Sequence, residues 1–283
     1  MTETPNYNFY EGGIHKFVQR YIQNLPSLAG KTALDIPCGA GRASLEFLKK
    51  GAEVHAFDLF PEFLKLENIQ AQYADLSETL PCEDNSYDYI ICEEGIEHLP
   101  DQVAALREFN RVLKPNGQLL LTTPNYSHIR CRISRLLFDY DYWKRVPPTE
   151  IDSVWFSKEG SSNMYFGHLF LLDVQTLYTL STIAGFRVEE RVKTKYSNSS
   201  FILGSLLFPL LAVMSVLSWL IYRKENNHVE QKVKDEILWR RVKLNLSPTT
   251  LFCKQTFWIL SKERSQEEVS LFLHDLQGST PQT

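Results

Sequence analysis

The chain has 283 residues, 43% of them hydrophobic, and a formal net charge of -4. This length fits one large domain with insertions, and the apolar content can build a core. The acidic total excludes a general attraction to nucleic acid, so such a partner would need a local basic patch. The best candidates, Arg130, Arg132 and Arg135, read better as a solvated or structural face, and no nucleic-acid partner is expected.

Five cysteines, an odd number without paired metal spacing, favour a reducing compartment over a disulfide framework. Residues 1–6 have neither a basic start nor an apolar stretch, so no signal peptide is visible. Both features predict a cytoplasmic protein.

Strands and helices alternate through the first half of the chain. Apolar periodicity predicts strands at 32–36, 53–57, 70–74, 87–92 and 117–123, with helices at 41–50, 61–67 and 101–113. Gly51 and the pair Asn116-Gly117 are helix stop signals. This alternation indicates a parallel sheet with helices on its faces.

Residues 125–167 lose the alternation and are rich in Arg, Tyr, Trp and Pro, which predicts a lid or substrate-facing insertion. Order then resumes with a helix at 172–184, which Gly185 ends. Strands are predicted at 186–193 and 252–260.

Between these last strands, the segment 198–250 contains an uncharged run at 201–222 that is interrupted by Gly204 and Pro209. The run is long enough to span a bilayer. If the two flanking strands pair side by side, however, both ends must lie on one side of a membrane. A segment that rests on a membrane surface therefore fits better, and so does a buried helical arm or hairpin, which would allow a homodimer. Apolar length does not separate these alternatives.

A glycine turn follows the first predicted strand, in the run Asp35-Ile36-Pro37-Cys38-Gly39-Ala40-Gly41. A second predicted strand closes on Asp58, where an acid can bind a ribose diol, so the pattern indicates a nucleotide-type cofactor. Ser44 is small enough to leave a dinucleotide, and thus an NAD-linked dehydrogenase, open as an alternative. An acid directly before the turn favours a cationic ligand such as a sulfonium over a pyrophosphate.

The run 35–41 resembles the first motif of class I S-adenosylmethionine-dependent methyltransferases. Residues 87–99 resemble their fourth-strand motif, and 113–125 is also typical of the family. The resemblance covers 30–125 well and 168–195 loosely, and it is nearest to the type 11/12-like enzymes that include the ubiquinone-pathway O-methyltransferases. It implies one Rossmann-like α/β domain over 1–283, with a parallel sheet, an antiparallel last strand, helices on both faces, and insertions.

The resemblance also implies the cofactor contacts. The turn residues Asp35, Pro37, Cys38, Gly39 and Gly41 would hold the methionine part, although Pro37 departs from the usual glycine. Asp58 would hold the ribose hydroxyls, and Leu59 would lie against the adenine. Asp75 and Leu76 would contact the adenine edge, and Cys92 or Glu93 would lie near the sulfonium. Asp75 is almost as well explained as a turn residue.

Beyond the fourth strand lies an E-x-x-E-H pattern, Glu94, Glu97 and His98, whose members would share one face if this piece were helical. With His168 they offer an oxygen and nitrogen set that suits a divalent metal, which would acidify an acceptor hydroxyl. Similar sites occur in ubiquinone-pathway O-methyltransferases and in small-RNA 3′-terminal 2′-O-methyltransferases. In the alternative without a metal, Glu97 and His98 brace the sheet end and His98 or His168 acts as general base, with Glu94 beside them.

These patterns predict an S-adenosylmethionine-dependent methyltransferase that acts on a hydroxyl of a small-molecule, glycan or lipid-linked acceptor. The alternatives are an RNA 2′-O-methyltransferase with a divalent metal and a non-catalytic cofactor-binding scaffold. A peripheral position at a membrane, through residues 201–222, is the alternative to a purely cytoplasmic one.

Overall fold

A computed structural model describes residues 12–140, 148–151, 153–156, 164–225 and 229–277. Residues 1–6, and parts of the expected lid insertion at 141–147 and 157–163, lie outside the described residues.

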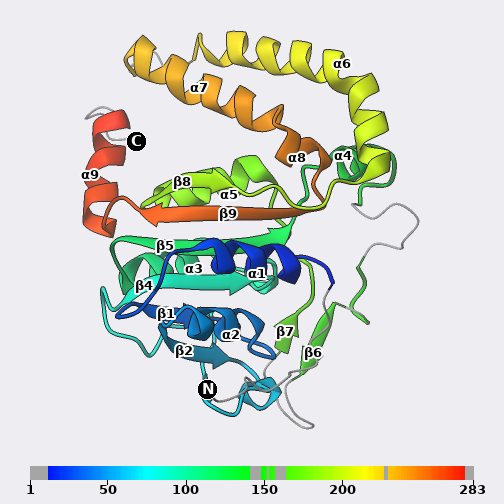
Figure 1. The fold of residues 1–283 in the computed structure, drawn as a ribbon. Helices are drawn as coiled ribbons and strands as arrows, with labels where there is room; N and C mark the ends of the chain where they lie inside the picture. Colours follow the sequence, from blue (N-terminus) through cyan, green and yellow to red (C-terminus); the bar gives the residue numbers. More distant parts are fainter. Residues whose placement is uncertain (1–11, 141–147, 152, 157–163, 226–228, 278–283) are drawn as a thin grey trace.

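One seven-stranded sheet carries the fold, in the order β3-β2-β1-β4-β5-β9-β8 (Figure 1). The strands are β1 (Thr32–Asp35), β2 (Glu53–Asp58), β3 (Ala71–Tyr73), β4 (Tyr87–Glu93), β5 (Leu113–Pro124), β8 (Phe186–Arg191) and β9 (Gln255–Lys262). Strands β1 to β5 are parallel, and β9 runs antiparallel to both of its neighbours, β5 and β8. The expected Rossmann-like sheet with an antiparallel last strand is confirmed.

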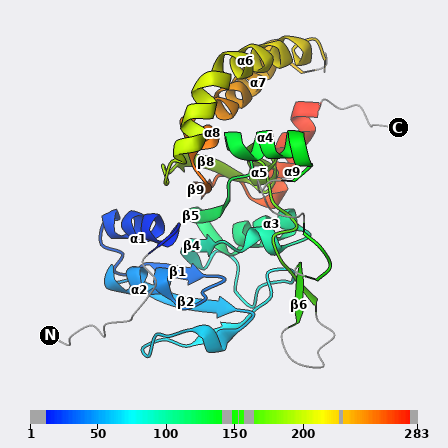
Figure 2. The ribbon, with the colours of Figure 1, turned by 90° about the vertical axis from the view of Figure 1, so that its right-hand side faces the viewer.

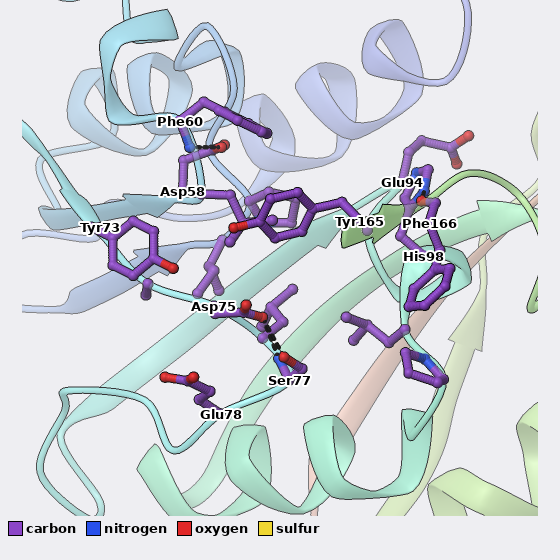
Figure 3. A pocket seen from close by; sticks show the side chains of 18 of the residues that line it. Asp58, Phe60, Tyr73, Asp75, Ser77, Glu78, Glu94, His98, Tyr165 and Phe166 are labelled. Atoms are coloured by element: carbon purple, nitrogen blue, oxygen red, sulfur yellow. Dashed lines mark hydrogen bonds between the residues drawn. The ribbon is translucent and has the colours of Figure 1, made fainter. Parts of the chain in front are cut away.

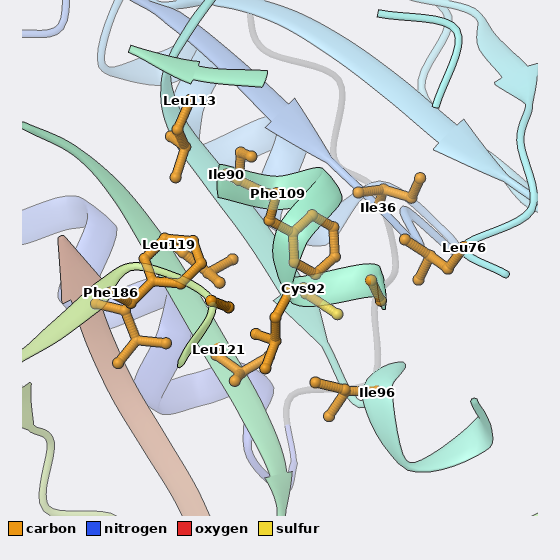
Figure 4. Packing of buried hydrophobic residues seen from close by; sticks show 14 of the residues in the cluster. Ile36, Leu76, Ile90, Cys92, Ile96, Phe109, Leu113, Leu119, Leu121 and Phe186 are labelled. Atoms are coloured by element: carbon orange, nitrogen blue, oxygen red, sulfur yellow. The ribbon is translucent and has the colours of Figure 1, made fainter. Parts of the chain in front are cut away.

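Helices cover both faces of this sheet, as Figure 2 shows. One face carries α1 (His15–Asn24) and α2 (Arg42–Lys49), and the other carries α3 (Gln102–Val112), α5 (Val174–Ile183) and α9 (Gln266–Gln277). Because successive strand residues point to opposite faces, Ile91 packs under α1 and α2 while Ile90 and Cys92 pack under α3 with Phe109 (Figure 4). The sheet is therefore buried on both sides, which leaves its carboxyl edge as the place for a site.

The expected helix at 61–67 is wrong, since only the 3-10 turn η1 (Pro61–Phe63) forms there. Leu64 takes an extended conformation, and the side chains of Leu64 and Leu66 both lie against Gly41. Two residues that are two positions apart can reach one point from an extended chain but not from a helix. Tertiary packing against the glycine turn thus overrides the local helical pattern.

The expected insertions form separate elements. Within 125–167 the structure has α4 (Ile129–Phe138) and an antiparallel pair, β6 (Val154–Phe156) and β7 (Met164–Phe166). Between β8 and β9 it has α6 (Asn198–Tyr222), α7 (Gln231–Asn245) and α8 (Pro248–Phe252). Figure 1 places α6 along the edge of the molecule, beyond β8 and α7, so α6 does not lie in the core of this chain.

Candidate active site

Three adjoining cavities follow the carboxyl ends of the parallel strands, and we number them along this edge. The first has a volume of about 210 Å³, the second about 560 Å³ and the third about 320 Å³. Pro37 and Asp58 line both the first and the second cavity, and Glu94 lines both the second and the third. The three spaces therefore form one continuous path along the edge of the sheet.

Three acidic side chains line the first cavity, Asp35 at the end of β1, Asp58 at the end of β2 and Glu93 at the end of β4. Burial raises the pKa of Asp35 to about 7, and the neighbouring charges of Glu93 and Asp58 act in the same direction. Oδ2 of Asp35 accepts hydrogen bonds from the amide and hydroxyl of Ser44, at 2.9 and 2.6 Å. A pocket in which neighbouring carboxylates raise the pKa of Asp35 favours a cationic ligand.

The glycine turn brings backbone to this cavity. The Gly39 amide donates to Oδ2 of Asp58 at 2.8 Å, and the Phe60 amide donates to Oδ1 at 2.9 Å, which fixes the carboxylate between two loops. Pro37, Cys38 and Gly39 line the cavity, and the Ile36-Pro37 peptide bond is cis.

Gly41 has a different role from the one expected, because it does not line any of the three cavities. Its φ is +84°, and an added Cβ would lie 2.6 Å from Leu64 Cδ1. Gly41 therefore starts α2 and allows the 64–66 segment to approach the turn.

The second cavity holds the residues expected for the ribose and the adenine. Asp58, Leu59, Asp75 and Leu76 all line it. Oδ1 of Asp75 also accepts from the Ser77 amide and hydroxyl at 2.8 and 2.6 Å, so its role as a turn residue is confirmed and its contact with the adenine stays a prediction. Figure 3 shows Asp58, Tyr73 and Asp75 at one end of this cavity and Glu94, His98 and Phe166 at the other.

The insertion supplies part of the wall of the second cavity. Tyr165 of β7 packs edge-on against Phe60, with ring centroids 5.8 Å apart, and its hydroxyl is hydrogen-bonded to Tyr73. Met164 and Phe166 line the same space. These residues of the 125–167 segment thus face the expected cofactor position.

Cys92 is not at the site, which corrects the expectation that it lies near the sulfonium. Its side chain is fully buried in the core beside Ile96 and Phe109, and burial raises the pKa of its thiol. Glu93 points to the face of β4 opposite to that of Cys92, and its carboxylate is hydrogen-bonded to His15 there. Of Cys92 and Glu93, only Glu93 lines the first cavity. We call the first and second cavities together the cofactor cleft.

Glu97, His98 and His168 converge, with one ligand atom from each within 4.8 Å of the others. Oε2 of Glu97 accepts from the Thr123 hydroxyl at 3.0 Å, whereas its Oε1 is buried without a hydrogen-bond partner and lies 4.0 Å from His168 Nε2. Burial raises the pKa of Glu97 to about 8. The ring centroids of the two histidines are 4.9 Å apart, and burial lowers the pKa of both.

Glu94 lies outside this converging set, which corrects the expected four-residue metal group. The short 3-10 turn η2 (Ile96–His98) begins only after it, and Glu94 has a φ of +52°, so the helical face expected for the motif does not form. Its carboxylate accepts from Thr122 Oγ1 at 3.2 Å, and burial raises its pKa to about 7. Glu94 instead forms the boundary between the second and third cavities.

The third cavity has a basic lining that sequence reasoning did not identify as a site. Its residues come from the end of β5, the start of α4, the loop before α5 and the start of β9, and they include His128, Arg130, His168 and Lys254. Burial, followed by the charges of Arg130, Lys254 and Arg132, lowers the pKa of His128 to about 4. Arg132 itself donates to the Ser127 carbonyl at 2.7 Å, so it serves the fold.

Sequence reasoning also missed His15, Tyr73 and Tyr165. His15 precedes the first strand, and the two tyrosines come from segments without a motif, so no local pattern marks them. The one available signal was the aromatic content of the insertion.

A profile of methyltransferase domains matches residues 10–191, and the chain belongs to this family. The sheet order and the acidic cleft are those of the class I methyltransferases, a class that uses S-adenosylmethionine as its methyl donor. The dehydrogenase alternative is wrong, and the scaffold and RNA alternatives are not favoured.

Several known proteins are similar to parts of the chain. The ubiquinone biosynthesis O-methyltransferase of Xanthomonas oryzae pv. oryzae is 39% identical over 114 residues, which are 37% of this chain and 48% of the relative. The enzyme of the same name from Psychrobacter cryohalolentis is 31% identical over 148 residues, 45% of this chain and 58% of the relative. The chain thus spans about half the length of these curated relatives.

Among solved structures, an S-adenosylmethionine-dependent methyltransferase from Mesorhizobium loti aligns with a TM-score of 0.49 at 13% identity. The alignment covers 89% of this chain and 99% of that one. The family match ends before α6, so the helical insertion 198–250 lies outside it.

Proposed function

We propose that this enzyme transfers the methyl group of S-adenosylmethionine to a hydroxyl oxygen of a small amphiphilic acceptor. One observation carries the proposal: His98 lines the second cavity, His168 lines the third cavity, and their ring centroids lie 4.9 Å apart. Two imidazoles that can accept a proton therefore lie where the second cavity, expected to hold part of the cofactor, adjoins the third. O-methylation needs this arrangement, because an alcohol is a poor nucleophile until it loses its proton.

The acidic first cavity supports the donor side of the proposal. Asp35, Asp58 and Glu93 suit a ligand that carries a sulfonium and an ammonium, and Asp58 is held where it can bind two ribose hydroxyls. The acceptor would then occupy the third cavity, beyond Glu94. Arg130 and Lys254 there favour an acceptor that bears a negative charge.

In the transfer step, the acceptor oxygen attacks the methyl carbon in line with the departing sulfur. The new O–C bond forms as the C–S bond breaks and leaves its electron pair on sulfur. The acceptor proton passes to His168, whose lowered pKa keeps it neutral and able to accept a proton near pH 7.

A divalent metal also fits the residues. Oε1 of Glu97 is buried, lacks a hydrogen-bond partner and faces His168, which is the condition a cation would relieve. Glu97, His98 and His168 would hold the ion, which would lower the pKa of an acceptor hydroxyl. The ubiquinone-pathway relatives favour an O-methyl product for this chain too.

The first test is calorimetric titration with S-adenosylmethionine and with S-adenosylhomocysteine. Binding of both is expected, and no binding by folded protein would remove the proposal. Labelled cofactor is then incubated with lipid extracts and, in parallel, with water-soluble extracts. Mass spectrometry should find a product that gains one methyl group through oxygen, and a product methylated on nitrogen or carbon would contradict the proposal.

The metal has its own test. The protein is treated with a chelator, dialysed, and titrated with Mg²⁺, Mn²⁺ or Zn²⁺, with Glu97→Gln as the matched variant. Binding that the variant weakens at least tenfold supports the ion. Full activity in chelator, together with loss of activity in His168→Ala, assigns His168 as a general base without a metal.

A further inference from the structure

Helix α6 has the reverse of the usual pattern of a surface helix. The residues that face its neighbours are small or polar, since Ser200, Gly204 and Ser215 are buried. Large apolar side chains point outward, with Leu206 73% exposed and Leu210 59% exposed. A helix in water turns its apolar side inward, so α6 is built for an apolar environment on its outer side.

The inward contacts of α6 are specific. Gly204 lies against the ring of Phe252, because an added Cβ would come within 2.4 Å of it. The Ser215 hydroxyl accepts a hydrogen bond from Asn245 at 2.8 Å. Helix α6 is therefore fixed to α7 and α8 in this orientation, and the exposed apolar side is a stable feature of the fold.

Helix α4 extends the exposed apolar surface. It is in contact with α6, and its last residues, Leu136, Leu137 and Phe138, are 83%, 58% and 55% exposed. We call α6 together with these three residues the apolar rim.

The segments that form and flank the apolar rim have an excess of basic residues although the whole chain is acidic, and one of them, Arg223, is paired with Asp235 of α7 at 2.8 Å. From Arg191 to Lys224 the sequence has five basic residues and no acidic one, and α4 has no acid and adds Arg130 and Arg135 besides Arg132, which is bonded within the fold. Basic residues beside an exposed apolar surface complement anionic lipid head groups.

The carboxyl end of α6 has the composition of a membrane interface. Trp219 packs edge-on against Trp239 at 6.0 Å, and the Arg223 guanidinium lies 5.3 Å from the Trp219 ring centre. Tyr222 is 53% exposed, and Lys224 is exposed beside it. Tryptophan, tyrosine and basic residues gather where lipid tails meet head groups.

Among the described residues α6 is the one helix long and apolar enough to cross a bilayer, yet the fold opposes a crossing. Helix α7 returns along α6, and β9 pairs with both β5 and β8 (Figure 1). Pro209 lies inside α6, where it interrupts the backbone hydrogen bonds. Both ends of α6 are thus attached to the same sheet.

We propose that the apolar rim binds the surface of an anionic lipid bilayer, with α6 lying in the head-group region without crossing it. The third cavity lies beside the amino-terminal end of α6, since the ring of His128, which lines the cavity, is 3.5 Å from the hydroxyl of Ser200 in the first turn of α6. If the proposed function holds, the acceptor would enter from the membrane. The binding itself does not depend on that function.

Flotation of the full chain with lipid vesicles tests the proposal. The wild type should float with phosphatidylcholine–phosphatidylglycerol vesicles and more weakly with phosphatidylcholine alone. Leu206→Glu should lower binding to the mixed vesicles roughly tenfold or more, because it places a charge in the apolar layer. Lys224→Gln should lower it about fivefold on mixed vesicles only.

The matched control is Leu271→Glu on α9, where the leucine is 68% exposed and lies outside the apolar rim. It should float like the wild type. Thermal unfolding and S-adenosylhomocysteine affinity, measured without vesicles, should match the wild type in all three variants. Failure of the wild type to bind that ligand would count against the proposed function and leave the flotation result intact.

Two results would overturn the proposal. The first is a wild type that stays with the soluble fraction in both vesicle types. The second is a wild-type dimer that Leu206→Glu converts to a monomer, by light scattering, without vesicle binding, which would make the apolar rim a protein interface.

Discussion

The cofactor cleft and the third cavity are built in different ways. The acids of the cofactor cleft stand at the ends of β1, β2 and β4, and the glycine turn between them adds backbone donors. The third cavity combines residues at the ends of strands, Glu94, Pro124 and Gln255, with residues of the 125–131 segment and His168. The cofactor cleft is therefore set by the strands of the sheet, whereas the third cavity also depends on insertions that can change without disturbing the sheet.

This difference predicts that the two parts can be damaged separately. Changes in the cofactor cleft should affect donor binding for any acceptor. Changes in the insertions should affect the acceptor first.

The largest effect is expected for Asp58→Asn. It removes the charge that the Gly39 and Phe60 amides hold in place, so S-adenosylmethionine affinity should fall at least 100-fold, about 2.7 kcal/mol. Titration calorimetry measures this directly. Asp101→Asn, at the start of α3, is the control and should bind the cofactor normally. An affinity for Asp58→Asn within threefold of the wild type would mean that the ribose lies elsewhere.

Gly41→Ala should destabilise the fold by about 2 to 3 kcal/mol, because the residue has positive φ and the new methyl group would meet Leu64. Gly30 also has positive φ, +77°, but nothing lies within 4 Å of its Cβ position. Gly30→Ala should therefore cost only about 1 kcal/mol. Urea unfolding compares the two variants, and equal costs would refute the contact with the 64–66 segment.

Asp35→Asn tests the buried acid. The folded protein raises the pKa of Asp35 from 3.8 to about 7, so its contribution to stability is complete below pH 4 and is lost as the pH rises through 7. Between pH 5 and pH 8 the cofactor-free wild type should lose at least about 1.4 kcal/mol more stability than the variant, the value of one pKa unit. Unfolding at both pH values measures this, and parallel curves would contradict the burial.

The smallest effect is expected where the insertion touches the cofactor cleft. Tyr165→Phe removes one neutral hydrogen bond to Tyr73 and keeps the ring against Phe60, so cofactor affinity should fall about fivefold. Tyr178→Phe, which loses a hydrogen bond to Arg240 on another face, is the matched control. A loss as large as that of Asp58→Asn would mean that the insertion belongs to the cofactor cleft.

Sequence patterns predicted the sheet and much of the cofactor cleft because both rest on local periodicity and strand-end residues. Asp35, Asp58 and Asp75 lie where the motifs suggested. The burial of Cys92 could not be predicted, since the motif does not show toward which face of β4 its side chain points.

The parts that failed depend on contacts between distant segments. The predicted helix at 61–67 does not form because Leu64 and Leu66 pack against Gly41. Glu94 does not join the predicted metal group because its backbone turns at positive φ. His15 and Tyr165 reach the site from outside any motif. The exposure of α6 depends on what α7 and α8 cover, and apolar length does not encode this.

The position of β9 has a consequence for synthesis. Among the described strands, β8 pairs in the sheet only with β9, which leaves the ribosome more than 60 residues later, after several seconds at about 5 to 20 residues per second. During that interval β5 has an open edge, and the apolar α6 emerges before β9 does. The nascent chain must therefore keep the apolar side of α6 out of contact with other chains before the sheet is complete. A ribosome-bound chain arrested before Gln255 has emerged should be the form most prone to aggregation.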